Sequence, residues 1–132
     1  MAIVVDTNVI SYLYKRDTRA KLYDAHLRDI PKLVSFMSLA ELYNWTLQNN
    51  WGSRRKEDLE KYVTDNYGII HSDEELCKIW ANIKSDAHKY GNPIDTADAW
   101  VAAVALFFDI PLVTHNRRHF QAVKNLQIIS ES

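Results

Sequence analysis

Short apolar runs alternate along the chain with longer segments of helical periodicity, and this alternation restricts the fold more than any other feature. The runs lack the apolar–polar alternation of a half-exposed strand, so each is typical of a strand buried on both faces. They are Ala2–Val5, Leu33–Met37, Gly68–His71, Pro111–Thr114 and Leu126–Ile129. Strands that alternate with helices form a parallel sheet covered by helices. A length of 132 residues suits one such domain, so we expect a single α/β sandwich over residues 1–132.

The segments between these runs have helical character. Apolar residues of segment 76–90 recur every three or four positions, and Ser72 with Glu75 predicts a capping box at its start. Gly91-Asn92-Pro93 predicts its end, because proline cannot continue a helix. Segments 39–49 and 59–67 predict amphipathic helices, whereas segment 97–108 is nearly all apolar and predicts a buried one.

The charge balance excludes binding of nucleic acid by bulk electrostatics. The chain has 16 Lys and Arg against 17 Asp and Glu, a net charge of −1, whereas proteins that bind in this way are basic. The clusters Lys15-Arg16 and Arg54-Arg55-Lys56 are either solvated surface or local contacts for a nucleic-acid backbone. No apolar run approaches the ~20 residues of a membrane span. With one cysteine, Cys77, and no signal peptide, we expect a cytoplasmic protein that does not bind a membrane.

Acidic residues follow the first two predicted strands. Asp6 comes directly after Ala2–Val5, where an ionised group beside buried residues needs hydrogen bonds or a metal. The alternative is that Asp6 caps the next helix, with Thr7 and Asn8 bonding local backbone groups. Glu41 follows the second run, and Ser38, three residues before it, makes a capping box the alternative there.

Two more polar groups lie near later elements. Asp95 and Asp98 begin the buried segment 97–108, and since a cap needs only one carboxylate, the other is left over. Asn116 follows the run Pro111–Thr114 and is either a helix cap or a polar group at the same edge of the sheet.

The carboxyl ends of parallel strands share one edge of a sheet, and ligands bind there at topological switch points. Asp6, Glu41, Asp98 and Asn116 all lie at such ends or at the helix starts beyond them. Three adjacent carboxylates stay ionised together only beside a cation. Oxygen ligands without a thiolate favour Mg²⁺ or Mn²⁺, which can activate a water and stabilise charge on a phosphodiester.

Taken together, four parts of the sequence resemble the PIN-domain family, and within it the VapC-type toxins of prokaryotic toxin–antitoxin pairs. They are Val4–Asn8, Ser38–Leu42, Gly91–Ile94 with Asp98–Ala103, and Leu112–Phe120. They follow the family's order and span nearly the whole chain. The resemblance implies a five-stranded parallel sheet flanked by helices and a Mg²⁺- or Mn²⁺-dependent endoribonuclease activity.

The resemblance also implies roles for particular residues. Asp6, Glu41 and Asp98 would be the catalytic acids that bind the metal. Related toxins often have another acid where this chain has His119, so the site is one acid short and Asp95 is a candidate replacement. Arg118 matches a basic residue that would contact phosphate or a carboxylate. The candidates for supporting the acids or touching substrate are Thr7, Asn8, Asp95, Asn116, Arg118 and His119.

The expected partners are an RNA substrate, a cognate antitoxin protein and a second copy of the chain in a homodimer, all implied by the resemblance. The aromatic residues of the early helices are either core or the lining of a groove for an amphipathic peptide helix. They are Tyr12, Tyr14, Tyr43, Trp45 and Trp51.

Strand-end aspartates also occur in other enzymes, but those fit less well. A haloacid-dehalogenase phosphatase would have a second aspartate where this chain has Asn8, and a receiver domain would have paired acids and a late lysine. The stronger alternative is a PIN-like module with a weakened site, which binds RNA or a protein partner without cleaving. His119 is the residue that supports this alternative.

Overall fold

The computed structural model describes residues 1–132 and contains one parallel sheet of five strands in the order β3-β2-β1-β4-β5. All four strand pairs are parallel, which confirms the predicted α/β class and five-stranded sheet. The strands are shorter than the apolar runs: β1 (Ile3–Val5), β2 (Lys32–Ser35), β3 (Gly68–Ile70), β4 (Leu112–Val113) and β5 (Ile128–Ile129).

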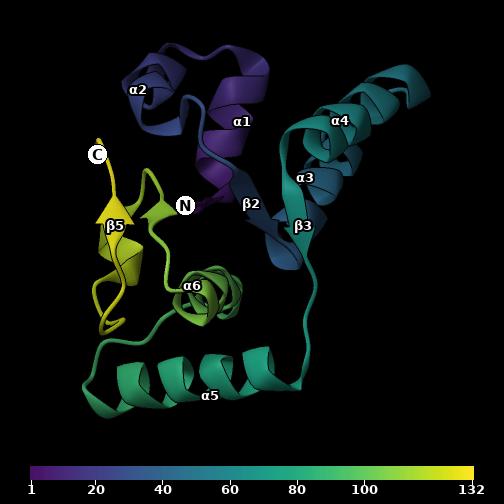
Figure 1. Cartoon of the computed structure of the whole chain (residues 1–132). Coiled ribbons are helices and arrows are strands. Elements are labelled where there is room, and N and C mark those ends of the chain that lie inside the picture. Colours follow the sequence, from purple (N-terminus) through teal and green to yellow (C-terminus); the bar gives the residue numbers. More distant parts are fainter.

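Helices cover both faces of this sheet (Figure 1). They are α1 (Thr7–Lys15), α2 (Asp24–Leu27), α3 (Phe36–Gln48), α4 (Ser53–Asn66), α5 (Glu74–Lys89) and α6 (Thr96–Phe108), with the 3-10 helices η1 (Thr18–Leu22) and η2 (Arg117–Phe120). Successive residues of β1 point to opposite faces: Ile3 and Val5 belong to the core beneath α1–α4, and Val4 to the core beneath α5 and α6.

The composition of α6 follows from its place between the sheet and α5 (Figure 1). Its buried residues are Ala99 and Val101–Ala105. A helix that packs on two sides has little surface left for polar residues. Two contacts from α5 also fix the segment before α6: Lys84 Nζ donates to the Ile94 carbonyl at 2.6 Å, and Trp80 Nε1 donates to the Thr96 carbonyl at 3.2 Å.

Two predicted helix starts are wrong. The α3 helix begins at Phe36, because Ser35 Oγ accepts a hydrogen bond from the Met37 N–H at 3.1 Å and caps it. Ser38 therefore lies inside the helix, and Ser38 and Glu41 form no capping box. In α5 the cap is Asp73, whose Oδ1 accepts from the Leu76 N–H at 2.8 Å, so Ser72 lies one residue outside the helix.

The strand order places a topological switch point between β1 and β4. From the central β1 the chain adds β2 and then β3 on one side, and then crosses to add β4 and β5 on the other. Connections diverge at such a point and leave a crevice at the carboxyl ends of the two strands. No helix of the structure has the length and apolar character needed to cross a membrane.

Candidate carboxylate site

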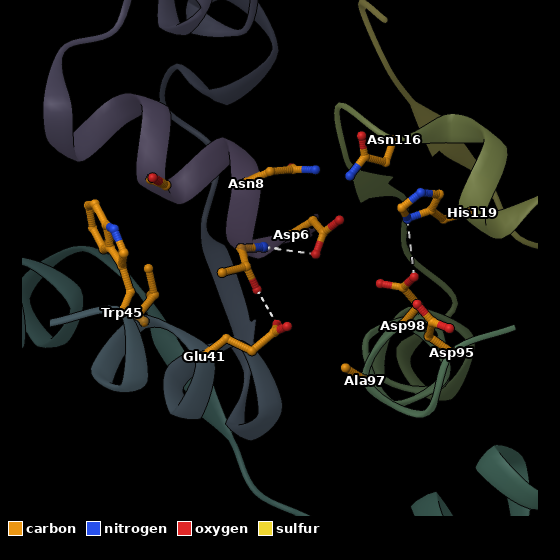
Figure 2. Close-up of a pocket in the computed structure, with 12 residues that line it drawn as sticks. Asp6, Asn8, Glu41, Trp45, Asp95, Ala97, Asp98, Asn116 and His119 are labelled. Carbon is orange, nitrogen blue, oxygen red and sulfur yellow. Dashed lines mark hydrogen bonds and ion pairs between the residues drawn. The ribbon is translucent and has the colours of Figure 1, made fainter. Parts of the chain in front are cut away.

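A cavity of about 400 Å³ opens at this switch point, and we call it the carboxylate pocket (Figure 2). Its lining comes from β1 and α1, from α3, from the start of α6 and from the segment after β4. The lining residues are Asp6, Thr7, Asn8, Ser11, Glu41, Leu42, Trp45, Asp95, Ala97, Asp98, Asn116 and His119. Eight of the nine predicted site residues line it, and Arg118 is the exception.

Asp6 is both the cap of α1 and part of the pocket. Its Oδ1 accepts from the Thr7 N–H at 2.8 Å, and its Oδ2 accepts from Thr114 Oγ1 at 2.7 Å. The side chain is buried, with 5% of the residue exposed. Burial, helped by repulsion from Asp98 and Glu41 and opposed by the two hydrogen bonds, raises the pKa of Asp6 to about 6.

Glu41 lies on the exposed side of α3 and faces the pocket. Its Oε1 accepts a hydrogen bond from Thr7 Oγ1 at 2.7 Å. Thr7 therefore touches two acids, Asp6 through its backbone and Glu41 through its hydroxyl. Since Glu41 caps no helix, the structure gives it no local role that would account for a carboxylate at this position.

Asp98 is paired with His119, the residue found where an acid was expected. Their closest atoms, Asp98 Oδ2 and His119 Nδ1, are 3.3 Å apart (Figure 2). Burial raises the pKa of Asp98, and the nearby charges of Asp95 and Glu41 also raise it, while His119 lowers it. Asp95 occupies the N-cap position of α6 but its side chain makes no capping hydrogen bond, so it is an exposed carboxylate at the rim of the pocket.

The asparagines differ in role. Asn8 Oδ1 accepts from the His115 N–H at 3.3 Å and so ties α1 to the segment after β4. Asn116 lines the pocket, and its side chain makes no capping bond for η2.

Arg118 lies outside the pocket and makes no ion pair with a carboxylate. Of the two contacts expected for Arg118, the one with a carboxylate is not formed in this structure, and the one with phosphate stays a prediction.

Two residues of the site were missed by sequence reasoning. Thr114 is fully buried; it donates to Asp6 and its Oγ1 accepts from the Asn116 N–H at 3.1 Å. Thr114 could have been predicted as a site residue from its position at the end of an apolar run. The carboxyl ends of β4 and β1 are neighbours, which places it beside Asp6. Trp45 forms one wall of the pocket, but which aromatic residue would do so depends on packing that the sequence does not display.

The donor atoms around the pocket suit a hard divalent cation. Most are carboxylate, amide and hydroxyl oxygens; His119 adds an imidazole, and there is no thiolate among them. As the side chains are placed, no group of three His, Cys, Asp or Glu residues is close enough to hold one ion. In Figure 2 one oxygen of Asp98 is directed at His119, and Glu41 lies across the pocket from both.

The fold and this site define the class of protein. The sequence matches the PIN domain family over residues 3–126. That match covers most of the chain, which therefore belongs to the PIN domain family.

Several proteins similar to this chain are named as ribonucleases. The chain is 29% identical to ribonuclease VapC1 of Haemophilus influenzae over 132 aligned residues, which cover 96% of each protein. The structure of VapBC-1 from nontypeable Haemophilus influenzae superposes with a TM-score of 0.82, covers 98% of each chain and is 27% identical. VapBC-5 of Mycobacterium tuberculosis, a member of the VapBC family of toxin–antitoxin systems, has a TM-score of 0.68 over 98% of this chain and 99% of its own. At 20% identity, that likeness shows the fold alone.

Proposed function

We propose that this protein is a Mg²⁺- or Mn²⁺-dependent endoribonuclease and the toxin of a toxin–antitoxin pair. One observation carries the proposal: Asp6, Glu41 and Asp98, from three separate elements, face one cavity at the switch point of a PIN-domain sheet. The relatives named as ribonucleases supply the reaction class, and the VapBC complexes supply the partner class.

Asp6, Glu41 and Asp98 would hold the metal ion. Such an ion, when bound, lowers the pKa of a water and stabilises negative charge on a phosphodiester. The raised pKa of Asp6 supports this assignment, because a buried carboxylate repelled by two others is relieved by a cation. Asp98 contacts His119 through Oδ2, which leaves its Oδ1 for an ion.

The chain's own hydrogen bonds prepare the acids for this role. Thr114 and the Thr7 backbone fix both oxygens of Asp6, and the Thr7 hydroxyl fixes one oxygen of Glu41. Donors that hold a carboxylate in place lower the entropy lost on binding an ion and set the direction of its free lone pairs. Asn116 and Asp95 are the remaining polar groups in reach of a substrate at the rim.

The proposal extends to location and assembly. A cytoplasmic toxin would meet both its RNA and its antitoxin there, and a homodimer remains part of the proposal. A second candidate function is a PIN-domain module that binds RNA or protein without cleaving. The observation that favours it is the present placement of Asp98 against His119, which leaves no three acids close enough for one ion.

The test is cleavage of a structured RNA pool by the purified protein in Mg²⁺, in Mn²⁺ and in EDTA. The Asp98→Asn variant tests the site, and Asp86→Asn, an exposed substitution on α5, is the matched control. We expect cutting in either metal by the parent and by Asp86→Asn, and none in EDTA or by Asp98→Asn. No cutting by antitoxin-free parent protein would favour the binding module.

A further inference from the structure

Two more cavities adjoin the carboxylate pocket and share residues with it. The first, which we call the aromatic cavity, has a volume of about 550 Å³ and is lined by Tyr14, Lys15, Trp45, Asn49, Trp51 and Arg55. Trp45 also lines the carboxylate pocket. The second, the basic cavity, has a volume of about 340 Å³ and is lined by His115, Asn116, Arg117, Arg118, His119 and Ser132. Asn116 and His119 also line the carboxylate pocket.

These shared residues place the cavities on opposite sides of the acids. In Figure 2 Trp45 lies at one side of the carboxylate pocket, beyond Glu41, and Asn116 and His119 lie at the other. The three hollows therefore follow one another across the surface: aromatic cavity, carboxylate pocket, basic cavity.

The aromatic cavity combines flat rings with unpaired cations. The rings of Trp45 and Trp51 have centroids 4.7 Å apart. Lys15 Nζ lies 4.4 Å from the centroid of the Trp45 ring, and Arg55 Cζ lies 3.8 Å from that of Trp51. Neither cation has a carboxylate within ion-pair distance. Trp45 is only partly buried, and Lys15 is the cation over its ring, so a base stacks on that face when the Lys15 ammonium moves aside to a phosphate.

The basic cavity has no hydrophobic lining residue. Arg117 and Arg118 are exposed there, and neither forms an ion pair with a carboxylate. Arg117 also donates a long hydrogen bond to the Ile128 carbonyl at 3.5 Å. Two guanidinium groups without a carboxylate partner beside two histidines form a site for phosphate rather than for an apolar side chain.

We propose that a single-stranded segment of RNA crosses the carboxylate pocket, with phosphates on Lys15 and Arg55 at one end and on Arg117 and Arg118 at the other, and with a base stacked on Trp45. The inference rests on the proposed function for the identity of the ligand. The order of charges supports it, since a strand whose central phosphate lies over the acids needs cations on both sides. Stacking on an indole needs an unpaired base, which selects loops and single strands over duplex.

A protein segment fits this order of charges less well. It would need acidic side chains at both ends and a basic one in the middle, and nothing on the surface of the basic cavity offers it an apolar contact. Protein binding is therefore the competing outcome of the test rather than the proposal.

Binding is measured without metal, so that cleavage is not required. A fluorescein-labelled, unstructured RNA of about 12 nucleotides is titrated in EDTA at several salt concentrations, and anisotropy is followed. The variants are Trp45→Leu, the pair Lys15→Gln with Arg55→Gln, and the pair Arg117→Gln with Arg118→Gln. Trp45→Tyr keeps an aromatic face, and Lys89→Gln, an exposed change on α5, is the control for loss of charge.

We expect Trp45→Leu to weaken binding about tenfold or more, with Trp45→Tyr close to the parent. Each double variant should reduce the slope of log K against log salt by about 1.4, or about 0.7 for each phosphate that is no longer neutralised. Lys89→Gln should leave both quantities unchanged. A duplex of the same sequence should bind more weakly, and its affinity should not depend on Trp45.

The inference is overturned if Trp45→Leu binds like the parent, or if either double variant keeps the parental salt slope. It is also overturned if the parent ignores the RNA but binds an acidic amphipathic peptide in the aromatic cavity. The two proposals fail separately: binding as expected without any cleavage in metal contradicts the nuclease, whereas cleavage with binding that ignores these variants contradicts the RNA path.

Discussion

Replacing Asp6 by asparagine should stabilise the metal-free protein at neutral pH. The pKa of Asp6 is raised from 3.8 to about 6 in the folded state. At about 1.4 kcal/mol per unit of pKa, the ionised form costs about 3 kcal/mol more in the folded protein than in the unfolded chain. The asparagine still accepts from the Thr7 N–H, but its amide group meets Thr114 Oγ1 as a donor, and that exchange costs about 1 kcal/mol. We expect a net gain of about 2 kcal/mol at pH 7.5.

The sign of the pH dependence follows from the same shift. Because the folded state binds the Asp6 proton more tightly than the unfolded chain, this group favours folding below pH 4, and the advantage is lost as the pH rises through about 6. An asparagine at this position does not titrate, so the gain from removing the charge should fall to about 0.5 kcal/mol at pH 4, where the exchange at Thr114 leaves the variant about 0.5 kcal/mol less stable than the parent. All other titrations are common to both proteins and largely cancel in the difference.

The assay is urea unfolding in EDTA at pH 7.5 and pH 4, followed by tryptophan fluorescence. Asp86→Asn is the matched control, since it removes a carboxylate from an exposed position and should change stability by no more than about 0.5 kcal/mol at either pH. An Asp6→Asn protein that is less stable than the parent at pH 7.5, or that differs from it equally at both pH values, would refute the reasoning.

Three further predictions concern neighbouring groups. Thr114→Val should lower the free energy of unfolding by about 1–3 kcal/mol, because the buried hydroxyl bonds both Asp6 and a backbone N–H; Thr114→Ser, which keeps the hydroxyl, should lose less, and equal losses in urea unfolding would count against the hydrogen bonds. Mg²⁺ at about 100 times its Kd should stabilise the parent by about 2.7 kcal/mol in thermal unfolding, and an equal effect on Asp98→Asn would remove Asp98 from the metal ligands. Tyr23→Phe should speed amide exchange at Glu131, whose N–H donates to the Tyr23 hydroxyl at 3.0 Å, and unchanged exchange there would show that this bond does not hold the C-terminal segment.

The sheet and helices α3 to α6 followed from the sequence, because each strand lies in a continuous apolar run, α3 to α5 are amphipathic and α6 is nearly all apolar. The short α2 helix was not predicted. The exact starts of the helices could not be predicted in this way. Ser35 and Ser38 are both good caps on propensity, and the choice between them was made by where β2 stops pairing with β3, at Ser35 opposite Ile70. Local signals of equal strength are separated only by tertiary contacts.

In the candidate site, too, some features could be predicted from the sequence and others depend on tertiary contacts. The sequence predicted that Asp6, Glu41 and Asp98 converge, because parallel strands share a carboxyl edge. All three line one pocket, but their role there stays a prediction. The pairing of Asp98 with His119 and the direction of Arg118 depend on how η2 docks, and a four-residue 3-10 helix gives no periodic signal that would predict it.

The hydrogen bond between Asp6 and Thr114 joins residues 108 positions apart. Asp6 directly follows the first strand made, whereas its partner comes after β4, near the end of the chain. During synthesis β1 therefore lacks one of its two neighbours until β4 has been made, and Asp6 lacks its bond to Thr114, 108 positions later, until then. The three acids therefore come together only after β4 has joined the sheet, and a reaction that needs all three cannot begin before that step.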